Sequence, residues 1–489
     1  MLDNPFEGRY DPLPPALAKR GFAQHLARVA DDVTLSYVRG PAHGEPLLLI
    51  PAQMGTWLTY ARIAAELSRD FEVLAVDVTG HGASSWTPGR YTWDAVGAHL
   101  AALLAATLEG PALVAGNSSG GIFALWLAAR HPEAVSAIVL EDAPVFSVEW
   151  PRFRDRDRFV YNGLVHAVEV LQAPDRRLAD YFRGQELPIS PRRAKRFPDW
   201  VIDRIIDPGV RRWERRHPGE PSGFQAWWAP AAFGELFRSL SMFDPDFARA
   251  FVDGRMYGDF SHAEALRAAR APILLMHANW LRIEPYGLVG ALDDDDVAHV
   301  LELAPRTRVR RFKANHVIHR DDPRGYIRAI REFRDSRSRA WTRAARRVSS
   351  RFSPTIRRRA AGASGCSASQ ASSAPAGSAP SRPTVAVDHS SDSRFSAMWK
   401  VRVSQMTRIR RAYSSTKGAS SSGRRSTSLK PRSVLTCVSL GMVAFSMSSR
   451  QTAALACGVG TAARAWAARS RPVVVRSRAS SAAISASPA

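Results

Sequence analysis

The sequence predicts an α/β protein organised around a doubly wound, mainly parallel eight-stranded sheet. Short apolar runs of strand length alternate with segments of helical length through most of the first 335 residues. One stretch, Pro111–Asp142, contains a strand, a tight turn, a helix and a second strand in direct succession. Two runs near the N-terminus alternate in the manner of paired strands on either side of Asp31-Asp32. Together these patterns favour a parallel sheet that opens with a hairpin.

The expected elements follow one another along the chain. Residues 22–29 and 33–38 form the hairpin, and Pro51 closes a buried strand at Leu47–Ile50. Helical segments follow at 57–68 and 95–108. The remaining strands are expected at 71–76, 113–115, 135–140, 273–276 and 308–312.

Between Pro144 and about Tyr257 the alternation of strands and helices stops. This insert is rich in arginine and aromatic residues, its spacing is mostly helical, and prolines divide it into short pieces. It is too long for an ordinary loop. We therefore expect a helical cap over the carboxyl edge of the sheet, with most of its aromatic residues in its own core and a few lining a pocket. The expected division is core segments 1–143 and 258–335, the cap 144–257, and a tail 336–489.

The positive charge of the chain is concentrated in the tail. The formal net charge is +23, but residues 336–489 hold 27 lysines and arginines against two acids, which leaves residues 1–335 close to neutral. Low hydrophobicity and charge of one sign predict that this basic tail is disordered. It could bind nucleic acid or an anionic surface, although no motif supports either partner. A frame-shifted translation of GC-rich DNA is the alternative origin of such a tail.

Cysteine usage and hydropathy exclude several classes of protein. Cys366, Cys437 and Cys457 all lie in the tail, so residues 1–335 offer neither a disulfide framework nor a cysteine-based metal site. The N-terminus has acids where a signal peptide needs a basic start. No run of 18 apolar residues occurs. We expect no membrane span and a cytoplasmic protein.

The turn at 116–121 fits the pattern G-x-S-x-G, with Ser118 at its centre. Gly116 and Gly120 stand where a sharp turn from strand to helix brings backbones too close together for a Cβ. Such a turn lifts the Ser118 hydroxyl out of the sheet, above unpaired N–H groups at the start of a helix. The pattern is weak alone, but its place between a strand and a helix makes Ser118 the candidate nucleophile.

A nucleophilic serine needs a base, and the loop after the last expected strand contains two histidines. It reads Lys313-Ala314-Asn315-His316-Val317-Ile318-His319. A histidine at this place can reach back over the edge of the sheet to Ser118, and we predict His316 as the base. His319 should face another way. The alternative for any single histidine is a hydrogen-bonded structural role.

On these motifs, residues 20–335 resemble the α/β-hydrolase superfamily. Besides the turn around Ser118, the segment Asp77–Ser84 is similar to the family's D-x-x-G-H-G-x-S turn, and the N-H-x-I-H loop around His316 also matches. The cap insertion after the sixth strand and the order serine, acid, histidine match as well. The resemblance implies an α/β-hydrolase fold and a structural role for His81, which braces its turn.

The acid that orients the base has two possible places. Many members of the superfamily carry it after the seventh strand in a loop of the form G-x-x-D, where this chain has Leu281. Others carry it after the sixth strand, where Glu141 and Asp142 follow the apolar run. Alternation puts these two side chains on opposite sides of the strand. We place Asp142 on the side of Ser118 and predict it as the acid.

Two further carboxylates compete for this role. Glu284 lies in the region after the seventh strand, and Asp293 begins a run of four aspartates. The run has a simpler interpretation, because acidic residues cap and start helices such as the one expected at 297–303.

The oxyanion that forms in acyl transfer needs N–H donors. The backbone N–H of Ser119 is expected to supply one. The second should come from the loop after the third strand, which reads Pro51-Ala52-Gln53-Met54-Gly55 where the family usually has H-G-x. Gln53 takes the position whose N–H points into this site. Met54 and Trp57 are expected to shape an apolar substrate pocket, with a core role as the alternative.

These residues predict a serine hydrolase that cleaves a carboxylic ester of a small to medium, partly apolar substrate through an acyl-enzyme on Ser118. No metal or organic cofactor is needed for this chemistry. The same scaffold also carries cofactor-free haloperoxidase, thioesterase, amidase and C–C hydrolase chemistry, so these remain alternatives. A non-catalytic ligand-binding protein is a further alternative, favoured by the unusual Pro51-Ala52 loop and by Leu281.

Overall fold

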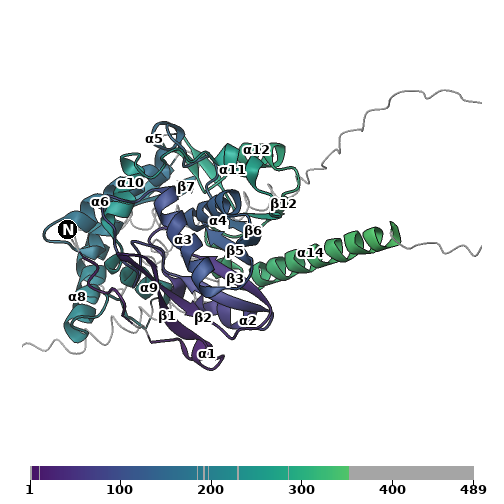
Figure 1. Cartoon of the computed structure of the whole chain (residues 1–489). Coiled ribbons are helices and arrows are strands. Elements are labelled where there is room, and N and C mark those ends of the chain that lie inside the picture. The colour runs from purple at the N-terminus through teal and green to yellow at the C-terminus, as the bar shows by residue number, and fades with distance from the viewer. Residues whose placement is uncertain are drawn as a thin grey trace, which may run out of the picture. The chain divides into compact units, whose positions relative to one another are not determined.

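A computed structural model describes residues 3–9, 12–183, 185–190, 193–196, 198–227, 229, 231–284 and 286–351. Its centre is a sheet of eight strands in the order β1-β2-β4-β3-β5-β6-β9-β12 (Figure 1). The strands are β1 (Ala23–Ala30), β2 (Val33–Arg39), β3 (Glu45–Ile50), β4 (Phe71–Val76), β5 (Ala112–Asn117), β6 (Val135–Glu141), β9 (Ile273–His277) and β12 (Arg308–Arg311). Strand β2 runs antiparallel to both neighbours, and all other pairs are parallel. The mainly parallel sheet with its opening hairpin is confirmed.

Alternate residues of the central strands enter two separate cores, one on each face of the sheet. On β3, Leu48 and Ile50 belong to one core, whereas Leu47 and Leu49 belong to the other. The first core is shared with α3 (Trp93–Thr107), α4 (Ser119–Arg130), α11 (His262–Ala268) and α12 (Asp294–Leu303). The second is shared with α1 (Pro15–Ala18), η1 (Trp57–Tyr60), α2 (Ala61–Leu67), α13 (Ile318–Asp321) and α14 (Pro323–Arg351). Helices therefore cover both faces, as in a doubly wound fold.

The insert between β6 and α11 is mostly helical, as the sequence indicates. Its helices are α5 (Arg152–Asp155), α6 (Arg158–Gln172), η2 (Leu178–Phe182), α7 (Asp199–Val201), η3 (Ile202–Ile206), α8 (Asp207–Arg216), α9 (Ala231–Ser241) and α10 (Pro245–Val252). The rings of Phe182 and Phe237 each lie 5.3 Å from the ring of Phe233, so several aromatic residues form a local core. Trp227 is an exception and is 64% exposed.

Two short hairpins were not expected from the sequence. The first, β7 (Glu186–Ser190) with β8 (Arg193–Arg196), interrupts the helices that follow β6. The second, β10 (Leu281–Ile283) with β11 (Gly287–Val289), separates β9 from α12. Strands of three to five residues are too short to show a periodic pattern.

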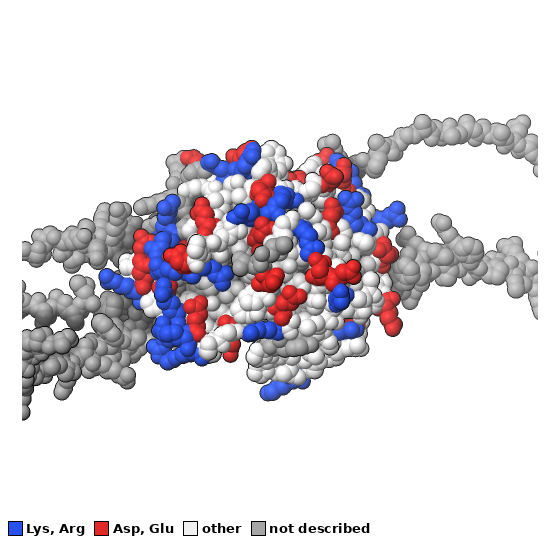
Figure 2. All heavy atoms as spheres, turned by 60° about the vertical axis from the view of Figure 1, so that its left-hand side comes forward, with Lys and Arg blue, Asp and Glu red and all other residues white. Residues whose placement is uncertain are grey.

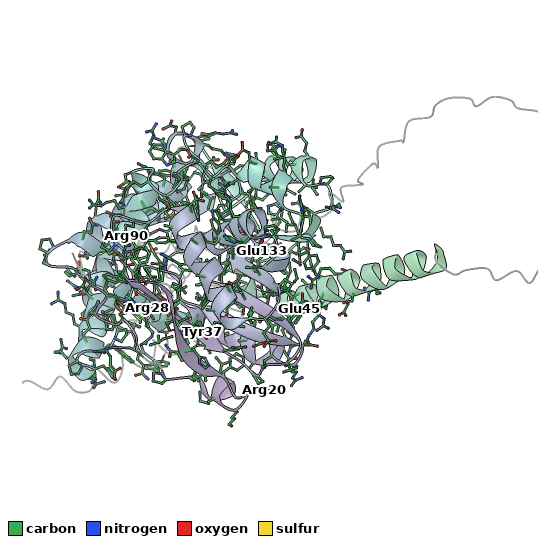
Figure 3. The ribbon with its side chains drawn as sticks, viewed as in Figure 1. Arg20, Arg28, Tyr37, Glu45, Arg90 and Glu133 are labelled. Carbon is green, nitrogen blue, oxygen red and sulfur yellow. The ribbon has the colours of Figure 1, made fainter. Side chains whose placement is uncertain are left out.

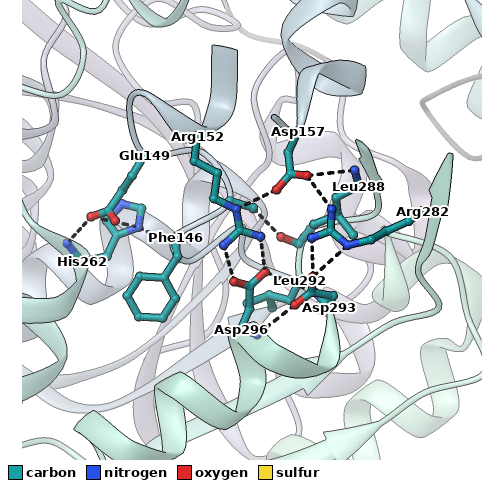
Figure 4. Close-up of polar contacts among 12 residues, drawn as sticks. Phe146, Glu149, Arg152, Asp157, His262, Arg282, Leu288, Leu292, Asp293 and Asp296 are labelled. Atoms are coloured by element: carbon teal, nitrogen blue, oxygen red, sulfur yellow. Dashed lines mark hydrogen bonds and ion pairs between the residues drawn. The ribbon is translucent and has the colours of Figure 1, made fainter. Parts of the chain in front are cut away.

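A cluster of buried charges fixes the second hairpin. Arg282 in β10 donates to Asp157 at 2.8 Å and to Asp293 at 2.5 Å, and Arg152 donates to Asp157 at 2.6 Å and to Asp296 at 2.9 Å. The three carboxylate side chains are at most 5% exposed. Figure 4 shows that the two guanidinium groups alternate with the carboxylates between the insert, the hairpin and the start of α12. Each buried carboxylate is thereby paired, which buried charges require.

Helix α14 continues beyond the expected start of the tail at Ser336. It ends at Arg351. Near the start of this extension, Arg337 donates to Glu45 at 2.5 Å and to Ser136 at 3.2 Å. Figure 3 labels Glu45 next to the helix, at the beginning of β3. A contact made through charge leaves no apolar pattern in the sequence. The rest of the expected basic tail lies outside the described residues.

Charges of both signs are interspersed on the face seen in Figure 2. This distribution agrees with the near-neutral balance of residues 1–335. In the part of the chain that the structure describes, every helix is too short or too polar to cross a membrane.

Candidate active site

Ser118 occupies a sharp turn between β5 and α4. Its backbone has φ 55° and ψ −123°, a conformation that costs about 1–3 kcal/mol for a residue with a Cβ. A Cβ on Gly116 would lie 2.0 Å from the carbonyl oxygen of Gly120, and a Cβ on Gly120 would lie 2.3 Å from the carbonyl oxygen of Ile50. The expected steric role of these glycines is confirmed. The side chain of Ser118 stands half-buried before the N-terminus of α4.

Asp142 and His316 are 174 residues apart in sequence and meet at the carboxyl edge of the sheet. The Asp142 Oδ2 atom lies 2.8 Å from His316 Nδ1. The other carboxylate oxygen, Oδ1, accepts from the Ala278 N–H at 3.0 Å, which fixes the orientation of the carboxylate. The Asp142 side chain is 2% exposed and that of His316 is 28% exposed. The contact through Nδ1 directs the second ring nitrogen, Nε2, away from Asp142.

The surroundings of His316 raise its pKa above the ordinary value of 6.5. Burial of the ring opposes protonation, but the hydrogen bond and the attraction to Asp142 outweigh it, with smaller contributions from Glu141 and Asp321. A raised pKa makes the neutral imidazole a stronger proton acceptor.

Asn117 joins the turn around Ser118 to the loop of His316. Its Nδ2 donates to the carbonyl oxygen of His316 at 2.9 Å and to that of Glu141 at 3.2 Å. The Ser118 N–H donates to the same Glu141 carbonyl at 3.0 Å. Sequence reasoning missed this contribution, because the residue before the serine is unspecified in G-x-S-x-G.

The other carboxylates considered from the sequence lie elsewhere. Glu141 pairs with His319, whose Nδ1 lies 2.9 Å from the carboxylate, so His319 faces away from Asp142 as expected. Glu284 is exposed in the turn between β10 and β11. Asp293 caps α12 through a capping box, which agrees with the acidic helix start expected there. Leu281, at the family's more common acid position, begins β10.

The two expected oxyanion donors have no acceptor among the described residues. Neither the Ser119 N–H, at the first position of α4, nor the Gln53 N–H, in the loop after β3, makes a hydrogen bond there. The side-chain Nε2 of Gln53 is also buried and has no partner in the described part of the chain. The free Ser119 N–H at the start of α4 favours a negative charge nearby.

The loop of Gln53 is held by the D-x-x-G-H-G turn. The Met54 N–H donates to His81 Nε2 at 3.2 Å, and Met54 has φ 59°. Asp77 Oδ1 accepts from the Trp57 N–H at 2.8 Å, beyond the other end of the loop. Burial lowers the pKa of His81 to about 3, so the ring stays neutral near pH 7 and keeps Nε2 as an acceptor. His81 thus braces the loop of Gln53.

Replacing His81 with phenylalanine is expected to lower kcat for the predicted hydrolysis about 10- to 100-fold, because the loop of Gln53, the predicted oxyanion donor, loses its support. His262→Phe is the matched control: the fully buried His262 Nδ1 accepts the N–H of Phe146, whose φ of 70° resembles that of Met54. Both variants lose the acceptor of one buried N–H and should lose about 1–3 kcal/mol in the free energy of unfolding. Equal kcat values in the two variants would contradict the special role of His81.

Met54 and Trp57 are both largely buried, with exposed fractions of 9% and 1%. Trp57 packs in the core that contains α14, which fits the alternative role considered for it. Their contact with substrate stays a prediction. In the described residues, no group of three or more His, Cys, Asp or Glu side chains is arranged to hold a metal ion.

Several known proteins are similar to parts of this chain. The model of the alpha/beta hydrolase fold family matches residues 45–205. N-formylmaleamate deformylase of Pseudomonas putida is 26% identical over 309 residues, which cover 63% of this chain and 94% of that enzyme. Pimeloyl-[acyl-carrier protein] methyl ester esterase of Chromobacterium violaceum is 43% identical over 100 residues, or 20% of this chain and 37% of that enzyme. A solved N-formylmaleamic acid deformylase of Pseudomonas putida covers 63% of this chain at 20% identity, with a TM-score of 0.42.

The family match includes β3, the D-x-x-G-H-G turn and the turn around Ser118. The strand order with a single antiparallel strand, and the strained serine between β5 and α4, belong to the same architecture. The relatives are hydrolases. The chain therefore has an α/β-hydrolase fold, and its residues 45–205 match the model of that family.

Proposed function

We propose that the protein cleaves a carboxylic ester of a small to medium, partly apolar substrate through an acyl-enzyme on Ser118. The observation that carries this proposal is the 2.8 Å contact between Asp142 and His316, at the sheet edge where β5 ends in the turn of Ser118. The methyl ester esterase among the relatives supports an ester as substrate.

In the proposed reaction, Ser118 Oγ attacks the ester carbonyl while His316 Nε2 takes the hydroxyl proton. Asp142 holds the proton on Nδ1 and stabilises the imidazolium. The N–H groups of Ser119 and Gln53 bind the oxyanion of the tetrahedral intermediate. The imidazolium then donates its proton to the leaving alcohol, and the acyl group stays on Ser118. A water molecule, deprotonated by His316, releases the acid and restores the serine.

The insert 144–257 is proposed to act as a cap that selects the substrate. Its helices contribute to the same core as α3 and α4, which flank the turn of Ser118. Its interior contains several aromatic side chains in contact with one another, and aromatic and apolar linings favour partly apolar ligands. Met54 and Trp57 are proposed to complete the apolar wall beside Gln53.

Hydrolysis of an N-formyl amide is a second candidate function. The deformylase relative aligns over 94% of its own length, far more than the esterase does. The proposed attack by Ser118 is the same for a formyl carbonyl, and only the leaving group changes from an alcohol to an amide nitrogen. Parallel assays with N-formylmaleamate and with p-nitrophenyl butyrate would separate the two candidates by kcat/KM.

The deciding experiment is reaction of the full-length protein with a fluorophosphonate, followed by peptide mapping. We expect one label per chain, on Ser118, together with a burst of p-nitrophenol from p-nitrophenyl acetate as the acyl-enzyme forms. Ser118→Ala should abolish both signals. Ser68→Ala, which changes a buried serine at the end of α2, should label as the wild type does.

Absence of label in the wild type would contradict the proposal and favour a ligand-binding protein without a live nucleophile. Label on Ser118 without turnover of esters or the formyl amide would retain the acyl-enzyme chemistry but overturn both proposed substrate classes. Unchanged turnover in folded Ser118→Ala would exclude the proposed mechanism.

A further inference from the structure

Glu141 contacts both the turn of the proposed nucleophile and the loop of the proposed base. Its carbonyl oxygen accepts from the Ser118 N–H at 3.0 Å. Its carboxylate accepts from the His319 backbone N–H at 2.8 Å and faces His319 Nδ1 at 2.9 Å. The next residue, Asp142, pairs with His316. Two adjacent carboxylates at the end of β6 therefore hold two histidines that lie three residues apart.

The pair of Glu141 and His319 lies in the interior, unlike the pair of Asp142 and His316. The side chains of Glu141 and His319 are 0% and 1% exposed, whereas His316 is 28% exposed. The buried pair thus holds the loop of His316 to the end of β6 at the start of α13. The Nε2 of the more exposed His316 points away from Asp142.

The opposite side of His319 contacts the segment that follows the oxyanion loop. Its Nε2 lies 2.9 Å from Thr59 Oγ1, and its ring lies 4.3 Å from the ring of Tyr60. The Tyr60 hydroxyl donates to the carbonyl oxygen of Ile50 at 2.8 Å, directly before the loop that contains Gln53. His319 consequently packs between the end of β6 and η1.

The hydrogen bonds around His319 form a continuous chain. His319 Nδ1 lies 2.9 Å from the Glu141 carboxylate, and Nε2 lies 2.9 Å from Thr59 Oγ1 on the other side of the ring. The Thr59 oxygen in turn accepts from Arg320 Nη2 at 3.1 Å, and the same nitrogen donates to Glu235 of α9 at 3.2 Å. The chain runs from β6 through α13 and η1 to the insert.

We propose that Glu141 and His319 are positioning residues, a second carboxylate–histidine pair that keeps the His316 loop and the oxyanion loop in register with Ser118. This inference rests on the proposed function. A buried carboxylate–histidine pair contributes little net stability compared with apolar residues of similar volume. We therefore assign the pair a role in positioning the two loops rather than in stabilising the fold. A displacement of about 1 Å at a reacting group lowers a rate about 100-fold.

The test uses full-length protein with Glu141→Gln combined with His319→Phe. A glutamine at position 141 carries no charge, but its amide oxygen still accepts the backbone N–H of residue 319, and the phenyl ring fills the space of the imidazole. We expect the melting temperature to stay within a few degrees of the wild type, while kcat and the rate of fluorophosphonate labelling of Ser118 fall about 10- to 100-fold. KM should change less than about 3-fold, since no substrate contact is removed.

Two further variants keep the inference falsifiable. Thr59→Val removes the hydroxyl at His319 Nε2 at a half-buried site and should lower kcat several-fold with KM unchanged. Glu149→Gln is the matched control, because Glu149 also accepts the backbone N–H of a buried histidine, His262, at 2.7 Å. This control should retain wild-type kcat (the pair is drawn in Figure 4).

The possible outcomes separate this inference from the proposed function. If the folded double variant and Thr59→Val both label Ser118 at the wild-type rate, the positioning role is overturned and the acyl-enzyme chemistry stands. If the double variant does not fold, the labelling rate of Ser118 in Thr59→Val alone decides: a wild-type rate overturns the positioning role. If the wild type is not labelled at Ser118, the proposed function fails and this inference fails with it.

Discussion

Asp142→Asn is expected to lower kcat for ester hydrolysis about 10⁴-fold, with the fold retained. The Ala278 N–H, 3.0 Å from Asp142 Oδ1, selects the orientation of the new amide, because only its oxygen can accept that hydrogen bond. The amide nitrogen then faces His316 Nδ1, which must become an acceptor. The ring proton moves to Nε2, where the proposed base needs a lone pair.

The same substitution should change the pH dependence of kcat/KM. In the wild type, the pKa of His316 is raised above 6.5, so activity that requires the neutral ring should fall as the pH drops through a value above 6.5. Loss of the Asp142 charge lowers this pKa, and the acidic limb of the remaining activity should move to lower pH. Steady-state kinetics from about pH 5 to about pH 9 would measure both effects.

Glu284→Gln is the control for the alternative acid. Glu284 is exposed in the turn between β10 and β11, and its neutralisation should leave kcat and the pH profile unchanged. A loss of about 10⁴-fold in this variant, with a small effect of Asp142→Asn, would move the acid to the loop after β9.

Gly116→Ala is expected to destabilise the fold by more than about 4 kcal/mol. The added Cβ would lie 2.0 Å from the oxygen and 2.1 Å from the carbon of the Gly120 carbonyl, and 2.5 Å from the nitrogen of Gly121. All three atoms belong to the backbone of the first turn of α4, so no side-chain rotation relieves the clash. Because residues of β5 and α4, on either side of this turn, pack in the hydrophobic core, the loss of stability should affect the whole domain. Urea denaturation followed by circular dichroism would measure it.

Gly110→Ala provides the matched control for this prediction. No heavy atom lies within 4 Å of a Cβ built on Gly110, and its φ is in the ordinary range. This variant should keep the free energy of unfolding within about 0.5 kcal/mol of the wild type. A Gly116→Ala protein of similar stability would show that the turn can open without cost, contrary to the geometry.

The sheet was predictable because its signals are local. The apolar runs, the hairpin near the N-terminus and the glycines around Ser118 each report on a few neighbouring residues. The hairpin β10–β11 escaped prediction, because its strands have three residues each and are held by Arg282 through aspartates distant in sequence. Helix α14 was not predicted either, and its Arg337 binds Glu45 through a charge contact that leaves no apolar pattern in the sequence.

The candidate site was predictable to the extent that topology fixes it. The placement of His316 follows from its position after the last strand, and alternation at the end of β6 separates Asp142 from Glu141. The contact between Glu141 and His319 joins residues 178 positions apart, and only the assembled sheet brings them together. The sequence does contain two adjacent carboxylates, Glu141 and Asp142, and two histidines three residues apart, His316 and His319. This match in number could have suggested that each histidine has its own carboxylate.

The hairpin β10–β11 also bears on the predicted place of the acid after β6. Its charges tie β10 to the insert and to α12, so the segment in which many α/β-hydrolases carry the acid here joins two other parts of the fold. A carboxylate introduced at Leu281 would enter a strand whose neighbour Arg282 is already committed to two aspartates. A working acid in this loop would therefore have to fit beside an arginine that two buried aspartates already hold in place.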